Sequence, residues 1–384
     1  MKLDLLLVSA SLFLFTFSFF SVKVLSLACV ALLGGYLLSY RRHGGVPFDK
    51  ASSLIALSFF SIVFLFSIFN EFYFNYFLKV TALTVMMILM SSYYLKLCNR
   101  YEFLNSLKLV VALHSGFFLI QFIVYMITGY FIPFDSYIRD YSDVLHLSRA
   151  LDGLTITIRG TGLFSEPSFY SMSILPFALA IMVIEKRIGL YALLGLGTAL
   201  LSLSIASIII VTLSLLIYSV FIGLSKFEKS VAIAAVILCS PFLYTVYDLR
   251  INQAIDYDAV SSRELIFDEI AIREWNEALF GWGFLWDGLY PQGHLLLNGA
   301  HIRDSSFYMY LVFCSGYVGL IIFLALTVSV FGIRSPYFYL LLSMLLFKHH
   351  FINAILWQLF FIFYISSRMG NNSFKEVKSD CSYS

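Results

Sequence analysis

Charge is scarce in this chain: only 12% of its 384 residues are Asp, Glu, Lys or Arg, whereas 60% are hydrophobic. Soluble proteins contain about 25% charged and about 45 to 50% apolar residues. This composition excludes an ordinary water-soluble domain, and the repeated apolar runs have the length, about 20 residues, that a helix needs to cross a bilayer. The net charge of +2 gives no indication of a nucleic-acid partner. The sequence therefore predicts an all-α integral membrane protein.

Several catalytic and transport motifs are absent as well. The sequence has no phosphate loop ending in Gly-Lys-Ser/Thr, no His-Glu-x-x-His pair and no nucleophile elbow, which disfavours ATP-driven transport and peptidase chemistry. His349 and His350 are adjacent, so they lack the helical spacing of a zinc site. Asp256-Tyr257-Asp258 resembles the triplet that binds a metal in nucleotide-sugar transferases, but it lies in an acid-rich loop and chance explains it better. The five cysteines avoid the long polar loops, which disfavours a disulfide framework.

The apolar runs and the breaks between them divide the chain into twelve candidate spans in one polytopic domain over residues 1–384. Residues 189–224 are split near Ser202 to Ser207, because a single helix of that length would extend about 54 Å, against a hydrocarbon core of about 30 Å. The spans are 3–20, 22–40, 51–69, 76–95, 109–129, 168–184, 189–203, 205–224, 230–247, 305–331, 336–348 and 352–366.

The basic residues of the short loops predict the orientation. Lys2 and the basic residues of every second connection share one side, which the positive-inside rule places in the cytoplasm together with both termini. The opposite short turns contain little beyond Lys23, Lys79 and Lys348. The two long polar segments, 130–167 and 248–304, then face outward, which in a bacterial inner membrane means the periplasm. The cytoplasmic set is Lys2, Arg41, Arg42, Lys50, Lys96, Arg100, Lys108, Lys186, Arg187, Lys226, Lys229, Arg334, Arg368, Lys375 and Lys378.

One outward stretch places an arginine and a carboxylate at the mouth of a span. It runs from Arg159 to Ser168, and Pro167 within it predicts that a helix begins there. Glu166 would then lie beside a helix N-terminus, which favours an anion. The alternative interpretation is that Glu166 only caps the helix while Arg159 extends to the interface.

The outward loops contain seven arginines and no lysine. Arginine offers a planar donor fork suited to phosphate, although the same loops are rich in acidic residues that would pair with most of these side chains. Four further groups are candidate acids and bases: Glu166, Asp304, His294 and His301. His301, Arg303 and Asp304 precede a span as Arg159 and Glu166 do, so we expect the two clusters to converge. The seven arginines are Arg139, Arg149, Arg159, Arg250, Arg263, Arg273 and Arg303.

The larger outward segment also carries an apolar periodicity that predicts amphipathic helices packed as a cap. Three tryptophans in it fit either interfacial anchoring or sugar stacking. The periodic residues are Leu265, Ile266, Ile270, Ile272, Trp275 and Leu279, and the tryptophans are Trp275, Trp282 and Trp286.

The Arg-x-x-Gly-Leu-Phe-x-Glu-Pro-Ser pattern of residues 159–168 resembles bacterial O-antigen polymerases, the Wzy family. Ser262-Arg263 followed by Phe280-Gly281-Trp282-Gly283-Phe284 is similar to an arginine and Gly-x-Gly pair in that family's large periplasmic loop, and Asp304-Ser305-Ser306-Phe307 is similar to the opening of its next span. The twelve-span plan with cytoplasmic ends also matches. O-antigen ligases share the architecture but usually have a histidine at the position of Asp304-Ser305, and His301 lies a few residues early for it.

The resemblance implies a GT-C-like bundle of about twelve membrane helices with two periplasmic loops, and an enzyme that needs no cofactor and no metal. The implied reaction transfers a glycan from undecaprenyl pyrophosphate to the terminal sugar of a lipid-linked repeat unit. The other partners would be membrane lipids and a protein that regulates chain length. An O-antigen ligase, or a flippase for the same lipid-linked unit, remains an alternative.

By this resemblance, Arg159, Arg263 and Arg303 hold the pyrophosphate, with Arg273 a further substrate-binding candidate. Glu166 accepts the proton of the acceptor hydroxyl, and Asp304 and His301 are the alternatives for that role.

Overall fold

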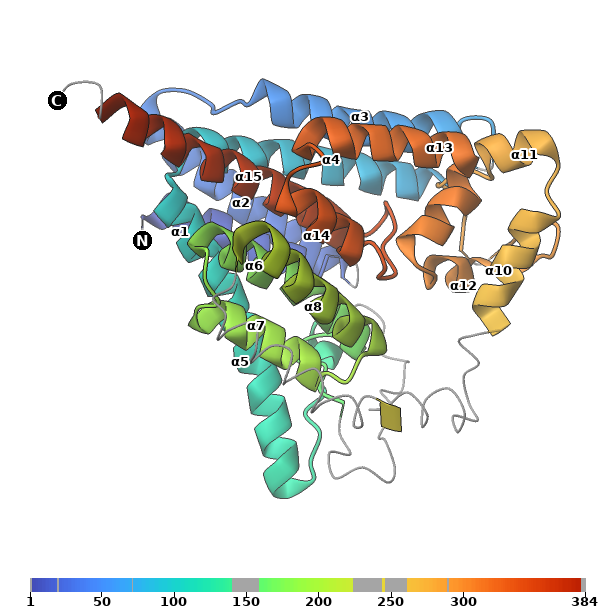
Figure 1. Ribbon diagram of the computed structural model, residues 1–384, viewed down its shortest axis with the longest axis horizontal. Helices are drawn as coiled ribbons and strands as arrows, with labels where there is room; N and C mark the ends of the chain where they lie inside the picture. Colours follow the sequence, from blue (N-terminus) through green and yellow to red (C-terminus); the bar gives the residue numbers. More distant parts are fainter. Residues whose placement is uncertain are drawn as a thin grey trace. The chain divides into compact units, whose positions relative to one another are not determined.

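The computed structural model describes residues 2–18, 21–70, 72–139, 159–223, 244–245, 261–288 and 290–380. In these ranges the predicted all-α architecture is confirmed (Figure 1). The strands that are described form one small hairpin of two strands with two residues each. The main elements are α1 (Leu3–Phe15), α2 (Val22–His43), α3 (Lys50–Ser67), α4 (Phe74–Leu97), α5 (Arg100–Thr128), η1 (Phe134–Tyr137), α6 (Pro167–Glu185), α7 (Leu190–Leu201), α8 (Ile205–Tyr218), η2 (Ser219–Gly223), α10 (Ser261–Ala271), α11 (Trp275–Phe280), β1 (Pro291–Gln292), β2 (Leu297–Asn298), α12 (Gly299–Arg303), α13 (Phe307–Phe331), α14 (Pro336–Met344) and α15 (Ala354–Asp380).

Seven of the described helices are long and apolar enough to cross a membrane: α2, α3, α4, α5, α6, α13 and the segment Ile205–Gly223. Three shorter apolar helices, Leu3–Phe15, Leu190–Leu201 and Ala354–Gly370, fall on further predicted spans. α14 has nine residues, and most of the predicted span 230–247 lies outside the described residues. The twelve-span count therefore stays a prediction.

The predicted break within residues 189–224 is confirmed. α7 ends at Leu201 and α8 begins at Ile205. Between them the backbone of Leu203 adopts a positive φ of 53°, a conformation that an L-residue does not adopt inside a helix. One helix therefore ends, and the next begins, close to the predicted break.

The chain divides into two compact units, which are described separately. Unit 1 comprises residues 1–54, 85–211 and 357–384, and unit 2 comprises residues 55–84 and 212–356. Whether the whole chain acts as one polytopic domain stays a prediction.

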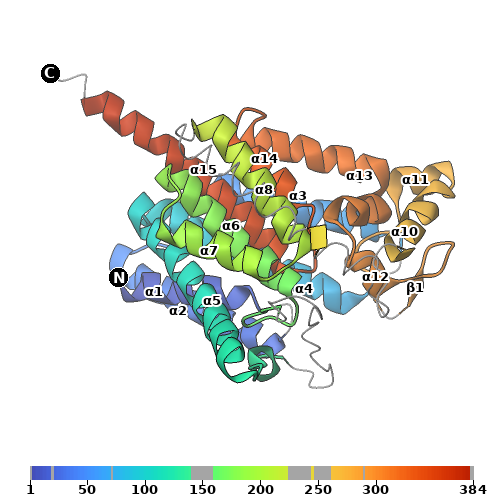
Figure 2. The same ribbon diagram turned by 60° about the horizontal axis from the view of Figure 1, so that its bottom comes forward.

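The core of unit 1 is α6, the helix that follows the Arg159 to Ser168 stretch. Every residue from Phe169 to Ile184 is buried, and α5 and α7 pack beside it in both views (Figures 1 and 2). A helix that is apolar on all sides and enclosed by other helices lies at the centre of its bundle. The start of α6 is therefore held from several directions.

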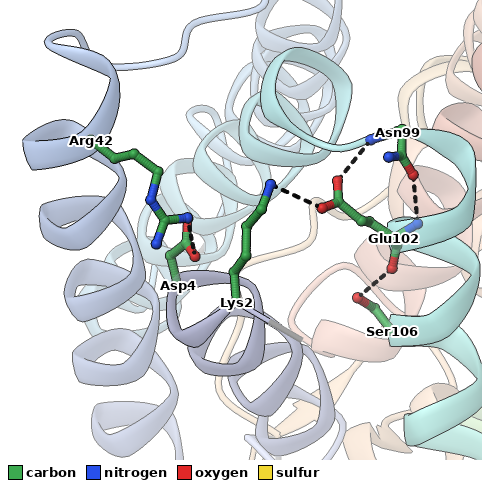
Figure 3. Close-up of polar contacts among 6 residues, drawn as sticks. All are labelled: Lys2, Asp4, Arg42, Asn99, Glu102 and Ser106. Carbon is green, nitrogen blue, oxygen red and sulfur yellow. Dashed lines mark hydrogen bonds and ion pairs between the residues drawn. The ribbon is translucent and has the colours of Figure 1, made fainter.

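Ion pairs gather where helix ends of unit 1 meet. Lys2 Nζ lies 3.2 Å from Glu102, and Arg42 Nη1 lies 2.9 Å from the carboxylate of Asp4, whose side chain is 3% exposed (Figure 3). Asn99 and Glu102 form a capping box that begins α5. The exposed Lys2–Glu102 pair contributes at most about 1 kcal/mol. The Arg42–Asp4 pair satisfies a buried carboxylate that would be costly to leave unpaired.

Two further pairs continue this group. Lys96 Nζ lies 3.3 Å from Asp49, and Lys108 Nζ lies 2.7 Å from Glu185 at the end of α6. Basic residues that the sequence assigned to one membrane side thus share the same helix ends in unit 1. The compartment that this end faces stays a prediction.

In unit 2, the long helix α13 is broken. Gly316 has φ 60° and ψ −165°, and the chain then resumes the helix up to Phe331. A Cβ atom at this position would lie 2.2 Å from the carbonyl oxygen of Leu279, so only glycine permits both the conformation and the contact with α11. The break leaves the last carbonyls of the first half-helix without helical donors.

A loop that precedes the hairpin satisfies those carbonyls. The backbone N–H of Trp282 donates to Phe313 O at 3.2 Å, and that of Gly283 donates to Cys314 O at 2.7 Å. Gly281 approaches so closely that a Cβ would lie 2.5 Å from the backbone of Cys314. The Gly-Trp-Gly sequence is therefore a backbone-to-backbone joint between the polar segment and α13.

Candidate functional site

Gln121, on α5, holds the stretch from Arg159 to Ser168 in place. Its side-chain oxygen accepts the backbone N–H groups of Thr161 at 2.8 Å and Gly162 at 2.9 Å. Its amide nitrogen donates to the carbonyl of Ile132 at 2.8 Å. Gln121 is 0% exposed, so this one side chain ties the stretch to a membrane-length helix and to the segment that follows it.

The glycines of the stretch allow close packing on α5. A Cβ at Gly160 would lie 2.7 Å from the ring of Phe118, and Gly162 has a φ of 57°. Phe164, which is fully buried, packs against Phe17 and against the ring of His114 at centroid distances of 4.9 and 5.5 Å. Larger residues at the two glycine positions would lift the stretch from the helix.

The stretch ends by starting α6, as the sequence predicts: Glu166 is the N-cap and Pro167 opens the first turn. The carboxylate of Glu166 makes no capping bond to the backbone. It instead accepts a hydrogen bond from Ser168 Oγ at 3.1 Å. Arg159 is only 4% exposed. Glu166 therefore occupies the N-cap position without a side-chain capping bond, and Arg159 is buried in the protein.

His114, buried in α5, touches the same stretch. Its Nε2 lies 3.3 Å from Thr16 Oγ1, and its ring packs against Phe13, Phe17 and Phe164. Because three aromatic rings enclose it, the imidazole of His114 acts as part of the core, and it packs against Phe164.

Arg273, in unit 2, is buried and contacts other residues of the protein. Its side chain is 0% exposed and lies 3.5 Å from Glu269, while Nη1 donates to Phe313 O at 3.0 Å. Like the backbone of Trp282 and Gly283, Arg273 therefore donates to a carbonyl that the break at Gly316 leaves without a helical donor. Glu269 in turn accepts from Leu295 N at 2.8 Å.

The buried face of α10 and the segment after it differs from the predicted apolar stripe. Ile266, Glu269 and Arg273 are buried, whereas Leu265 and Trp275 are 47% and 79% exposed. The predicted helices are present, but their buried face contains the Glu269–Arg273 ion pair and not the full apolar stripe that the periodicity predicted.

Arg303, at the end of α12, is held between two aromatic rings. Its guanidinium carbon lies 4.3 Å from the ring centre of Trp286 and 4.8 Å from that of Tyr76. Nη2 donates to the carbonyl of Trp286 at 2.8 Å, and Nη1 donates to Tyr76 Oη at 3.3 Å. A Cβ at Gly288 would lie 2.6 Å from Nη1, so this glycine leaves room for the guanidinium.

Asp304, one of the candidate bases, is paired. Lys348 Nζ lies 3.2 Å from Asp304 Oδ1, and the Asp304 side chain is 40% exposed. His301 is exposed on α12. Of the outward candidates, the structure therefore brings Arg303 and Asp304 together with Lys348.

The remaining candidates are placed as follows. Arg139 forms a local pair with Asp135 at 3.2 Å, and Arg263 lies in the first turn of α10. Arg149, Arg250 and the triplet Asp256-Tyr257-Asp258 lie outside the described residues. Within the part of the chain that is described, no group of three or more His, Cys, Asp or Glu residues is placed to hold a metal ion.

His294 contacts Glu277 across the polar segment. The distance from Nε2 to Oε2 is 2.7 Å. The hydrogen bond to Glu277 raises the pKa of His294 above its usual value. This pair lies at the surface, where it ties the hairpin turn to α11.

Three functional candidates escaped the sequence analysis: Lys79, Lys348 and His350. Lys79 lies on α4 one turn after Tyr76 and within range of the charge of Arg303. His350 is 3% exposed, and the basic residues around it include Arg303, Lys79, His349 and Lys348. Burial, and then these basic neighbours, lower the pKa of His350 well below its usual value, so its ring is neutral. The available signal was that both lysines fall on the predicted outward side.

Comparison with known proteins gave no match to a family model, to a curated protein or to a solved structure. The class of protein that the helices themselves define is a helical membrane protein.

Proposed function

We propose that this protein is a membrane glycosyltransferase of the O-antigen polymerase type. It would transfer a growing polysaccharide from undecaprenyl pyrophosphate to the terminal sugar of a lipid-linked repeat unit on the periplasmic side of a bacterial inner membrane.

The observation that carries this proposal is the fixed position of the Arg159 to Ser168 stretch. Gln121 binds its backbone, the two glycines seat it on Phe118, and Pro167 starts the central helix of unit 1. An arginine and a carboxylate are thereby held at the end of a membrane-length helix. That arrangement suits a substrate whose reactive phosphate is carried at the membrane surface by a lipid.

The transfer needs two kinds of group. The acceptor hydroxyl oxygen attacks the anomeric carbon of the donor sugar, and the bond from that carbon to the pyrophosphate oxygen breaks. The carboxylate of Glu166 accepts the hydroxyl proton, and undecaprenyl pyrophosphate leaves as an anion. Arg159 stabilises the charge that develops on the leaving group, for which a guanidinium in a site with little water is well suited.

The contacts of the other candidates refine their roles in this proposal. Arg303 is oriented for a phosphate by two rings and two hydrogen bonds. Arg273 is fully buried beside Glu269, and its Nη1 donates to a helix carbonyl, so we assign it to the structure of unit 2. Asp304 is paired with Lys348, which favours Glu166 over Asp304 as the base. A regulator of chain length remains an expected partner.

The test is the lipopolysaccharide of a strain that lacks the gene, separated on a gel and complemented with variants. Loss of the ladder, leaving core with a single repeat unit, is expected for the deletion and for Glu166→Gln. Arg159→Lys keeps the charge but not the planar fork, and we expect it to shorten or abolish the ladder.

Matched controls are Glu264→Gln and Arg41→Lys, which change exposed residues of the same types and should retain the ladder. Core without any repeat unit in the deletion strain would indicate a ligase or a flippase, and an unchanged ladder would refute the proposal. A full ladder from Glu166→Gln at normal abundance would remove Glu166 as the base.

A further inference from the structure

Unit 2 gathers three cationic side chains that are far apart in the sequence. We call Lys79, Arg303 and Lys348 the cationic cluster. They come from α4, from the end of α12 and from the turn that follows α14. No local sequence pattern predicts that these three residues are neighbours, because the fold brings them together from separate elements.

Arg303 is the fixed member of the cationic cluster. Stacking between Trp286 and Tyr76 confines its guanidinium plane, and the bonds to Trp286 O and Tyr76 Oη set its rotation. The Nε atom is buried and has no hydrogen-bond partner among the described residues. A preoriented guanidinium with a donor to spare loses little entropy when it binds an oxyanion.

Lys79 enters the cluster from α4. It lies three residues after Tyr76, so the two side chains share one face of the helix, and Tyr76 already contacts Arg303. Lys79 is half-buried. A lysine inside an otherwise apolar membrane-length helix is costly unless it has a functional partner.

Lys348 is brought in by the turn between α14 and α15. The first N–H of α13, on Phe307, donates to Leu345 O and Phe347 O at 3.2 and 3.0 Å, which docks the turn beside Asp304. Lys348 then contacts Asp304 and is 14% exposed. His350, from the same turn, lies 6.0 Å from the ring of Tyr310 and contributes no charge.

Like charges meet in the cationic cluster. Asp304 pairs with one of its cations, Lys348. Lys79 lies within range of the charge of Arg303, and all three cations lie within range of His350. Like charges at low dielectric repel strongly, and a bound anion would reverse that cost.

We propose that the cationic cluster binds the phosphate group of a lipid-borne anion. Lys79 lies five residues after the start of α4, about 7.5 Å along the axis, and so near one end of a membrane-length helix. Lipid phosphates lie where such helices leave the apolar layer. Arg303 supplies the planar fork, and Lys79 and Lys348 supply compact charges. The inference rests on the proposed function only in taking a prenyl diphosphate as the first ligand to test.

The experiment measures binding rather than transfer. The purified full-length protein in detergent is titrated calorimetrically with farnesyl diphosphate, inorganic pyrophosphate and phosphatidylglycerol. Lys79→Met is expected to weaken binding of the lipid-borne ligand about tenfold or more, the usual effect of losing one charged hydrogen bond, while Lys79→Arg retains it. Lys348→Met should weaken it too. The control is Lys23→Met, an exposed lysine predicted on the same side, and thermal unfolding verifies that each variant is folded.

The three ligands identify the source of the phosphate. Lys79-dependent binding of farnesyl diphosphate indicates a prenyl carrier, and Lys79-dependent binding of phosphatidylglycerol alone indicates a phospholipid headgroup. Equally tight, Lys79-dependent binding of inorganic pyrophosphate would overturn the requirement for a lipid. Wild-type affinity in both Lys79→Met and Lys348→Met would overturn the site itself while leaving the proposed transfer intact. If Lys79→Met and Lys348→Met lose affinity but deletion of the gene leaves the lipopolysaccharide ladder unchanged, the site stands and the proposed transfer is refuted.

Discussion

Replacing Gln121 by leucine should uncouple the Arg159 to Ser168 stretch from α5 without touching Arg159 or Glu166. The variant removes three hydrogen bonds of 2.8 to 2.9 Å and leaves two buried N–H groups and one carbonyl without partners. Each buried group left unsatisfied costs about 1 to 3 kcal/mol. The two N–H groups alone therefore predict a loss of roughly 2 to 6 kcal/mol, partly offset by the apolar leucine.

Two measurements on Gln121→Leu separate stability from positioning. Thermal unfolding in detergent should show a clearly lowered midpoint, and the lipopolysaccharide ladder should be lost even at a temperature where the variant is folded and abundant. Gln121→Glu is expected to rescue both in part. A buried carboxyl group becomes protonated, and its O–H and C=O then reproduce the donor and acceptor of the amide.

The matched control is Gln358→Leu. This buried glutamine donates one hydrogen bond, to Leu12 O at 2.8 Å, and lies apart from the stretch. It should lower the midpoint less, by about 1 kcal/mol of stability, and keep the ladder. If Gln121→Leu has a wild-type midpoint and a full ladder, the hydrogen bonds of Gln121 do not position the stretch, and the reasoning fails.

Three further predictions concern unit 2. Gly316→Ala should destabilise the protein by about 2 kcal/mol or more, because the residue has a positive φ and its Cβ would collide with α11. The control is Gly116→Ala, whose added Cβ has no neighbour within 4 Å and which should leave the unfolding midpoint unchanged or higher. His294 should titrate above about 6.5 in histidine NMR spectra. Its pair with Glu277 stabilises below that pH and is lost as the pH rises through the raised pKa, so Glu277→Gln should return the titration to the usual range. Asp304→Asn removes a carboxylate that pairs with Lys348 and should tighten diphosphate binding severalfold; weaker binding would contradict the role of charge in the cationic cluster.

The features that the sequence predicted correctly depend on local backbone rules. Pro167 marks the start of α6 because its ring fixes φ for the first turn. The break near Ser202 follows from the thickness of a bilayer, which limits how far one helix can extend. Both arguments need only a short window of sequence.

The features that the sequence missed depend on distant partners. The buried face of α10 carries Glu269 because Arg273 is drawn to carbonyls that become available only where α13 breaks. Lys79 and Lys348 looked like isolated charges because Arg303, the residue that relates them, is more than two hundred positions from Lys79 in the chain. Of the candidate site, the stretch around Arg159 could be recognised from sequence, whereas the neighbours of Arg303 could not.

The joint between the Gly-Trp-Gly loop and α13 restricts sequence change very unevenly. Its hydrogen bonds run from backbone N–H to backbone C=O, so they impose no side chain on the residues that form them. The restriction falls on Gly281 and Gly316, where a Cβ would collide, and on Gly283, whose φ of 80° disfavours other residues. The residues that exchange these bonds can therefore change in identity without loss of the bonds themselves, whereas the three glycines are fixed by the backbone that they must adopt.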